Sequence, residues 1–435
     1  MTDAALTASA AAAGAPQGIR AAVERRLKKR HAAERRFRAY GLIAIAVAIA
    51  FLGVLLTRIV VQGHGAFMTN TMEMQVRLDP ARIDATDIQG ANYDLIIADQ
   101  MVARLGIADP TGDKGMEMKD LLSTDLGFQV LDQLRANPKL MGSTLTLAAP
   151  LGADADLYFK GEMRRSTPEG ERTLNDSQLD MLDKMKAAGM IQQHFNWGLF
   201  TRGDSTHPEQ AGLLGAVVGS AMMLLVTALL AVPIGVLAAV YLEEFAPKNP
   251  LTSFIEVNIN NLAAVPSIVY GLLGLAVFIH WMGLPRGSPL VGGLVLALMA
   301  LPTVIIATRS SLKAVPPSIR EAALGVGASR TQAVFGHVLP LAMPGVMTGA
   351  ILALAHALGE TAPLLMIGMI AFVQGAPDSF LSSASTLPTQ IFIWENASER
   401  AFHPLTAAAI IVLLVFMIVM NAAAIVLRRA FERRW

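Results

Sequence analysis

The sequence has no cysteine among its 435 residues, which excludes disulfide bonds, thiolate metal sites and thiol nucleophiles. Charged residues are also scarce, at 16%, and the formal net charge is only +1. A chain with so little excess positive charge is not expected to bind nucleic acid. Apolar residues make up 53% of the chain and gather into long runs. This composition is typical of a membrane protein that carries a polar insert.

Six apolar runs are long enough to cross a bilayer as helices, because a hydrocarbon core of about 30 Å needs roughly 20 residues. The runs are residues 41–61, 212–241, 254–281, 290–308, 345–373 and 405–427. We therefore expect an all-α polytopic membrane protein with six transmembrane helices. Its expected divisions are a basic N-terminus (1–40), a first helix (41–61), a polar domain (62–210), a membrane core (211–427) and a basic tail (428–435).

The distribution of basic residues predicts the orientation in the membrane. Between Arg20 and Arg38, nine Lys and Arg residues accompany only two acidic ones, and the chain closes with RRAFERRW. By the positive-inside rule, both termini are cytoplasmic and residues 62–210 are extracytoplasmic. A cleaved signal peptide is the alternative for the first run. Its basic region is too long and no small-residue cleavage site is evident, so an uncleaved anchor is favoured.

The polar insert, residues 62–210, is long enough to have its own core. Met72, Met74, Val76 and Leu78 alternate as in a strand, whereas residues 93–105 and 178–190 show helical spacing. We expect a small α/β domain. Its histidines occur singly in the sequence, so a metal site is not expected; they are His64, His194 and His207.

The stretch from Arg320 to Gly345 reads as two short helices between apolar runs. Ser318 with Glu321 and Ser329 with Gln332 each form a potential capping box. Glycines between them predict a bend, and prolines bracket both ends of the segment; these residues are Gly325, Gly327, Pro316, Pro317, Pro340 and Pro344.

Small side chains give this segment a flat face that suits insertion into a groove of another protein. Ala322 and Ala323 begin the face, and Ala328, Ala333 and Phe335 continue it. The alternative is an amphipathic connector lying on the membrane, although such an anchor usually carries Trp, Leu and Lys.

The spacing of Glu321-Ala322-Ala323, Gly327 and Leu339-Pro340 resembles the EAA loop of permease subunits of ATP-binding-cassette (ABC) importers. His337 departs from the family pattern, which has an aliphatic residue there. YLEEFAPKN, NINNLAAVPSIVYGLLGL and ALGETAPLLMIG resemble the PstA-type permeases of bacterial phosphate importers. The likeness extends from about residue 195 to the C-terminus. It is greatest to a long form with an extra extracytoplasmic domain after the first helix.

This resemblance implies a type I importer core of five helices in the bacterial inner membrane. It implies an EAA coupling loop over residues 313–345 that docks on a cytoplasmic ATPase. It also implies four partner proteins: a homologous second permease, two ATPase copies and an extracytoplasmic phosphate-binding protein. The chain contains no GxxxxGK[ST] string, so ATP and Mg²⁺ are expected on the ATPase and this chain is expected to be neither an enzyme nor a cofactor binder.

Ionisable side chains within apolar runs are costly in lipid and are candidates for function. Glu360 lies 15 residues into the fifth run, and His356 precedes it by one turn on the same helix face. We expect a hydrogen bond between them. A metal pair is the alternative, but a third ligand is lacking. By resemblance, Glu360 lies on the translocation pathway, where it gates or pairs with a cation. Arg309 is the candidate cation, although its depth differs and it could instead snorkel to the inner surface.

The third run carries more polar residues, namely Asn258, Asn261, Ser267 and Tyr270. Polar groups in hydrocarbon need partners, so this face is expected to line a wet path or to bind another helix. We count these four residues among the translocation-pathway candidates.

The sequence is interpreted as a phosphate-importer permease, with three alternatives. A permease for another oxyanion, such as sulfate or molybdate, fits the same physical features. A membrane receptor would need a large cytoplasmic signalling domain, which this chain lacks. A secondary transporter would usually show internal repeats and needs no EAA-like loop.

Overall fold

The computed structural model describes residues 17–83, 88–107, 113–123, 125–370 and 372–431. The chain divides into two compact units, Met1–Val61 and Gln62–Trp435. All of the described residues of the first unit belong to helix α2, Gln17–Gly63. Apolar side chains are exposed along its length, for example Phe51 at 74%. A helix with this surface needs lipid or other helices around it.

The α/β domain, residues 68–195, is built on a three-stranded antiparallel sheet in the order β2-β1-β3. Met74 in β1 pairs with Leu147 in β2, and Thr71 pairs with Gln192 in β3. The strands are β1 Met68–Arg77, β2 Thr144–Pro150 and β3 Ile191–Phe195. The predicted alternation in β1 is confirmed: Met72, Met74 and Val76 are buried while the residues between them are partly or fully exposed.

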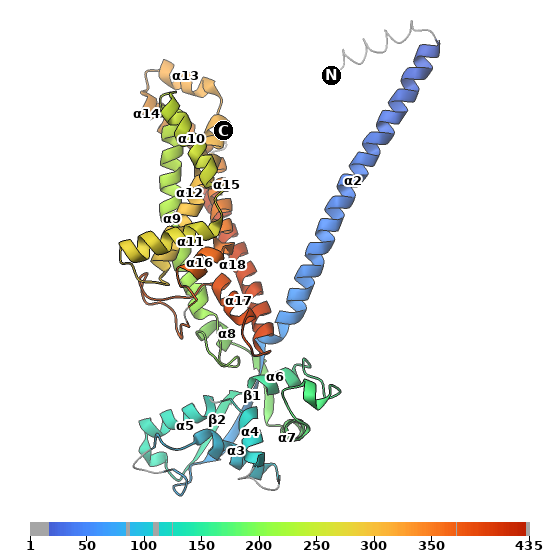
Figure 1. The fold of residues 1–435 in the computed structure, drawn as a ribbon, viewed down its shortest axis with the longest axis vertical. Helices are drawn as coiled ribbons and strands as arrows, with labels where there is room; N and C mark the ends of the chain where they lie inside the picture. Colours follow the sequence, from blue (N-terminus) through green and yellow to red (C-terminus); the bar gives the residue numbers. More distant parts are fainter. Residues whose placement is uncertain (1–16, 84–87, 108–112, 124, 371, 432–435) are drawn as a thin grey trace. The chain divides into compact units, whose positions relative to one another are not determined.

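Helices of the α/β domain cover the apolar face of the sheet (Figure 1) and share one core with it. They are α3 Tyr93–Arg104, α4 Asp113–Leu121, α5 Asp125–Ala136, α6 Ala153–Phe159 and α7 Asp176–Ala187. The domain also contains the 3₁₀ turns η2 Pro138–Leu140 and η3 Glu169–Glu171, and a further 3₁₀ turn, η1 His64–Phe67, precedes β1. The two helices predicted over 93–105 and 178–190 are thus present as α3 and α7.

The remaining chain is helical. It comprises α8 Gly198–Thr201, α9 Leu214–Val240, α10 Pro250–Leu262, α11 Ser267–Gly274, α12 Pro289–Lys313, α13 Pro317–Gly325, α14 Arg330–Ala333, α15 Leu339–Gly359, α16 Ala362–Met366, α17 Leu387–Glu395 and α18 Phe402–Phe431. Three π-helical segments extend these helices: η4 Tyr241–Phe245, η5 Leu275–Trp281 and η6 Val334–Val338. In Figure 1, α13 and α14 lie at the end of α9 that is remote from α8.

Within the described residues, five helices are long and apolar enough to cross a membrane, and a bent pair makes a sixth candidate. The bent pair is the third predicted span: α10 and the α11–η5 helix meet at 101°. Pro266 explains the break, because its ring in a continuous helix would clash with the carbonyl of Leu262. That carbonyl instead accepts hydrogen bonds from the Val265 amide and, at 2.8 Å, from the Tyr270 hydroxyl.

The fifth predicted span, 345–373, differs from the structure. Helix α15 ends at Gly359, Glu360 is extended (φ −82°, ψ 120°), and a separate short helix, α16, follows. Pro363 accounts for this, since a continuous helix would bring its ring against the carbonyl of Gly359. Glu360 therefore lies at a helix end, and the expectation that it lies deep within a continuous helix is wrong.

Candidate functional site

The EAA-like loop, residues 313–345, is formed by α13, a bend and a second helix that enters the membrane core. Gly327 makes the bend with φ of +92°, a conformation that glycine adopts without strain. The capping box predicted at Ser329 is present: Ser329 Oγ accepts from the Gln332 amide at 3.2 Å, and Gln332 Oε1 accepts from the Ser329 amide at 2.9 Å.

Two expectations for this loop are corrected. The N-cap of α13 is Pro316, without a side-chain cap, so Ser318 and Glu321 form no capping box. Pro317 occupies the first helical position, where its fixed φ starts the helix and leaves Ser318 inside it. The second helix also does not leave at Pro340 and Pro344. It continues through η6 into α15, where both prolines fall within its first two turns.

The inner face of the loop packs on the ends of α9, α12 and α15. Its shared core consists of Val240, Leu312, Val315, Val334, Val338, Ala342 and Val346. Ala323 and Ala333, which the sequence placed on the flat outer face, are buried, whereas Ala322 and Glu321 are exposed. Leu339 and Pro340 are half-buried where the loop joins α15.

The outer face of the loop carries exposed apolar groups. Val326 is 87% exposed, and Leu324 and Phe335 are each nearly half exposed. Together with Glu321 and Ala322 they form a small apolar surface with an acidic edge. Exposed apolar side chains that lie together with a polar edge are typical of a protein contact site.

Arg320 fastens α13 to the end of α9. Its guanidinium donates to the Glu244 carboxylate through Nη2 at 2.6 Å and through Nε at 3.1 Å. It also donates to the backbone carbonyls of Leu312 and Val315, at 2.9 and 2.8 Å. The hydrogen bonds with Glu244 raise the pKa of Arg320 above its ordinary value. Bidentate arginine–carboxylate pairs are among the stronger and more directional polar contacts in proteins.

Arg309, at the same end of α12, joins α12 to two other segments. It donates to Glu243 in η4 at 3.3 Å, and its Nη2 lies 2.8 Å from Glu256 of α10. Lys313 adds a contact with Glu243 at 3.6 Å. Arg309 is thus already occupied by two carboxylates and forms no ion pair with Glu360.

Sequence reasoning missed this network because its partners are far apart along the chain. Arg309 and Glu243 are separated by 66 residues, and Arg320 and Glu244 by 76. One signal was available: two adjacent carboxylates follow a long apolar run, and Arg309 directly follows another. Charges at such positions are expected to find partners.

The polar residues of the bent span have different surroundings. Tyr270 is buried and its hydroxyl closes the break after α10. Ser267 begins α11 and is half-buried. Asn258 is exposed and donates to the Phe254 carbonyl at 2.7 Å, and Asn261 is exposed on the same helix. The structure brings Tyr270 into the packed core and leaves both asparagines on the surface of α10.

His356 and Glu360 face each other, as expected, with 3.4 Å between Nε2 and Oε1. The imidazole is largely exposed and the carboxylate is mostly covered, at 69% and 22%. The following segment packs tightly on α11: a Cβ on Gly271 would lie 2.7 Å from the Cα of Pro363. Within the described residues, no group of three His, Asp or Glu side chains could hold a metal ion.

At the other end of the membrane helices, two carboxyls are covered, and neither forms an ion pair with any residue that the structure describes. Asp204 accepts from the indole of Trp394 and from the Ser205 amide, both at 3.0 Å. Glu209 accepts from the Ser123 hydroxyl of the α/β domain at 3.3 Å. Burial raises the pKa of both Asp204 and Glu209 above their ordinary values.

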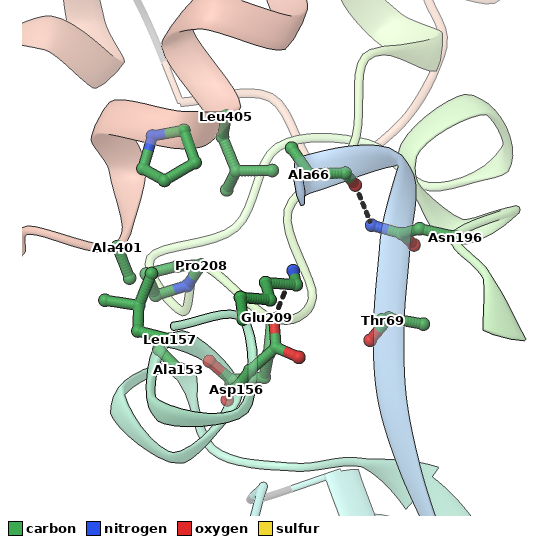
Figure 2. A pocket seen from close by; sticks show the side chains of 12 residues that line it. Ala66, Thr69, Ala153, Asp156, Leu157, Asn196, Pro208, Glu209, Ala401 and Leu405 are labelled. Carbon is green, nitrogen blue, oxygen red and sulfur yellow. Dashed lines mark hydrogen bonds and ion pairs between the residues drawn. The ribbon is translucent and has the colours of Figure 1, made fainter. Parts of the chain in front are cut away.

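Glu209 lines a small cavity of about 30 Å³ between the α/β domain and the start of α18 (Figure 2). Asn196 donates to the Ala66 carbonyl at its edge, at 3.1 Å. Asp156 on the facing helix forms an ion pair with Lys160. The volume accommodates about one water molecule, so this cavity is a packing gap rather than a ligand site.

Comparison with known proteins shows which families the chain resembles. Residues 231–435 match the family described as binding-protein-dependent transport system inner membrane component. Residues 24–169 match a domain of unknown function, DUF3333. The probable ABC transporter permease protein YqgI of Bacillus subtilis (strain 168) is 32% identical over 253 residues, which are 54% of this chain and 83% of that protein.

Phosphate transport system permease protein PstA 1 of Mycobacterium tuberculosis is also 32% identical, over 232 residues that cover 52% of this chain and 74% of that protein. Among solved structures, an inward-facing MetNI methionine ABC transporter matches at 20% identity, with a TM-score of 0.40, over 51% of this chain and 96% of that one. The chain belongs to the inner-membrane permease family of binding-protein-dependent transport systems, as a multi-pass transport component with an additional α/β domain.

Proposed function

We propose that this chain is a transmembrane permease subunit of an ATP-driven importer that moves inorganic phosphate into the cytoplasm. The observation that carries the proposal is its 32% identity to a phosphate transport system permease over 74% of that protein's length. The family match spans residues 231–435, which hold most of the membrane core, where the substrate has to cross.

The orientation follows from charge. The basic residues between Arg20 and Arg38, in the N-terminal part of α2, and those after the last apolar run support a cytoplasmic location for both termini and the EAA-like loop. The α/β domain then lies outside, where a substrate-binding protein delivers its cargo. The first helix is retained as a membrane anchor.

The partners are a second, homologous permease, two cytoplasmic ATPases that hold ATP and Mg²⁺, and an extracytoplasmic phosphate-binding protein. The exposed apolar face around Val326 and Phe335 supports docking of the loop on an ATPase. Helix α10 supports the second permease, because Asn258 and Asn261 lie exposed on it beside exposed apolar side chains, and polar groups at membrane depth need a partner or water.

The ion pairs supply a path for force. When the ATPases close, a pull on α13 passes through the Arg320–Glu244 bond to the end of α9. Arg309 passes the same displacement to η4 and α10 through Glu243 and Glu256. The translocation pathway beside α15 then opens toward the cytoplasm. His356 and Glu360, at the end of α15, act as gating groups on this pathway.

Uptake by the complete transporter, reconstituted in vesicles with its ATPases and binding protein, tests the proposal. Radiolabelled phosphate, sulfate and molybdate are compared with and without ATP. We expect ATP-dependent uptake of phosphate and at least tenfold less of the other two anions. The variant Glu321→Lys, on the outer face of the loop, should abolish uptake and weaken ATPase binding, whereas Glu73→Lys on the exposed face of β1 should leave both unchanged.

If sulfate or molybdate were taken up equally well, the chain would still be an importer subunit, but phosphate would not be its specific substrate. Normal uptake by the Glu321→Lys complex would show that this face of the loop does not dock on the ATPase.

A further inference from the structure

A second cleft, far larger than the cavity beside Glu209, lies between the α/β domain and the start of α18. Its volume is about 380 Å³, within the range of small-molecule sites. Three segments form its walls: α6, the segment from Glu162 to Thr173, and the residues Arg400–Pro404. The resemblance to importer permeases does not account for this cleft, because the α/β domain is the part of the chain that the permease core lacks.

Arg172, in the wall of this cleft, is a buried cation with unused donors. Its side chain is only 3% exposed, and its Nη2 forms an ion pair with Asp176. Among the described residues, however, neither its Nε nor its Nη1 has a hydrogen-bond partner. A buried charged group left short of hydrogen bonds costs free energy, and a bound anion is one way to satisfy its donors. Asp176 is 62% exposed, and its charge is therefore largely screened by water.

Two further arginines line the same cleft. Arg164 and Arg400 are both exposed, and neither forms an ion pair with a described carboxylate. His403 lies beside Arg400, at the first turn of the 30-residue helix α18. Converging arginines present planar, multiple donors that match the oxygens of an oxyanion.

Acidic side chains in the lining narrow the ligand class. Asp154, Glu162 and Glu171 line the cleft as well. A carboxylate repels an anion that only accepts hydrogen bonds, as sulfate does at neutral pH. Phosphate retains an O–H group at neutral pH, so it can donate to a carboxylate while its other oxygens accept from arginine.

We propose that this cleft binds inorganic phosphate on the α/β domain side of the permease, held by Arg172, Arg164 and Arg400 and recognised through its O–H by a carboxylate of the lining. Because Nε and Nη1 of Arg172 lie behind the surface of the wall, the guanidinium turns toward the cleft when the anion enters. This site is separate from the translocation pathway, and the inference does not depend on which anion is transported.

Equilibrium binding of radiolabelled phosphate to the full chain in lipid nanodiscs tests the proposal. We expect saturable binding, with sulfate at least tenfold weaker. Arg172→Gln and Arg400→Gln should each weaken binding at this site at least tenfold, or reduce the number of ions bound per chain by one. Arg165→Gln is the matched control, because Arg165 is next to Arg164 but already pairs with Asp180 and with Asp183, the latter at 2.8 Å.

Arg400 is exposed, so its substitution should leave folding intact even if the Arg172 variant proves unstable. The site is disproved if phosphate binding is absent or is unchanged in Arg400→Gln. It is also disproved if Arg165→Gln weakens binding as strongly as Arg400→Gln. Equal binding of sulfate would overturn the assignment to phosphate.

Discussion

The charged side chains at the two ends of the membrane helices have different kinds of partner. At the EAA-like loop, carboxylates and arginines lie in direct contact: Glu244 with Arg320, and Glu243 and Glu256 with Arg309. At the α/β domain end, Asp204 and Glu209 accept hydrogen bonds from neutral Trp394 and Ser123. Arg172 is the converse case, a buried cation with open donors.

This difference suggests that the loop end transmits force between helices, whereas the end next to the α/β domain binds protons or anions. Oppositely charged side chains in direct contact resist separation, so they suit a connection that transmits a pull from one helix to another. Charges that are covered but incompletely paired keep capacity for a proton or a ligand. We therefore expect variants at the loop to alter coupling, and variants at the other end to alter stability with pH and anion binding.

The largest expected effect comes from reversing the charge at the loop. Arg320→Glu places a carboxylate against Glu244 and removes the donors to Leu312 and Val315. We expect ATP-driven uptake to fall about tenfold or more, which corresponds to roughly 1.4 kcal/mol in the coupled step. ATP hydrolysis by the assembled complex should persist, because the docking face of the loop is unchanged. The measurement is the ratio of anions transported to ATP hydrolysed.

A charge swap gives this prediction its control. Combining Arg320→Glu with Glu244→Arg restores the ion pair but not the bonds to the two backbone carbonyls, so part of the lost coupling should return. Arg320→Lys keeps the charge without the bidentate geometry and should lie between the wild type and Arg320→Glu. Unchanged coupling in the single reversal would contradict the role of this pair.

The second prediction concerns pH and Asp204. Burial raises the pKa of its carboxyl, so the folded state holds its proton to higher pH than the unfolded state does. The resulting stability is fully present below the ordinary aspartate pKa and is lost as pH rises through the raised value. Asp204→Asn keeps an acceptor for Trp394 without the charge. We expect it to be more stable than the wild type at pH 8, by on the order of 2 °C in Tm.

This advantage should shrink at low pH, where the wild-type carboxyl is protonated. Thermal unfolding of the purified chain in detergent at several pH values measures it. Asp132→Asn is the control, because that side chain is 76% exposed and should show little effect at any pH. A constant difference between Asp204→Asn and the wild type over the whole range would mean that burial does not govern this carboxyl.

Local patterns predicted the parts of this structure that depend on neighbours in the chain. The period-two alternation around Met74 marks one buried face, and it gives a strand whatever packs on it. The Ser329 capping box needs only Gln332, three residues later. Apolar run length predicted candidate spans in the same way, but it did not predict the 101° bend in the third or the helix end at Gly359 in the fifth.

Features that depend on distant partners or on competition between signals could not be predicted in this way. Glu360 was read as mid-helix because hydropathy continues past it, but Pro363 ends the helix. Ser318 has the same capping spacing as Ser329, yet Pro317 takes the first helical position. The partners of Arg309 and Arg320 lie on another helix, and only the fold brings them together.

The smallest expected effect compares these two serines. Ser329→Ala removes the cap that its hydroxyl provides to the Gln332 amide, at a cost of about 1 kcal/mol. Hydrogen exchange at Gln332 should then be roughly fivefold faster. Ser318→Ala should change nothing nearby, because that hydroxyl caps no helix. Both variants should couple far better than Arg320→Glu, since the Arg320–Glu244 pair still joins the loop to α9. If Ser329→Ala uncoupled transport as severely as the charge reversal, the connection between the loop and the membrane helices would depend on the second helix of the loop rather than on the Arg320–Glu244 ion pair.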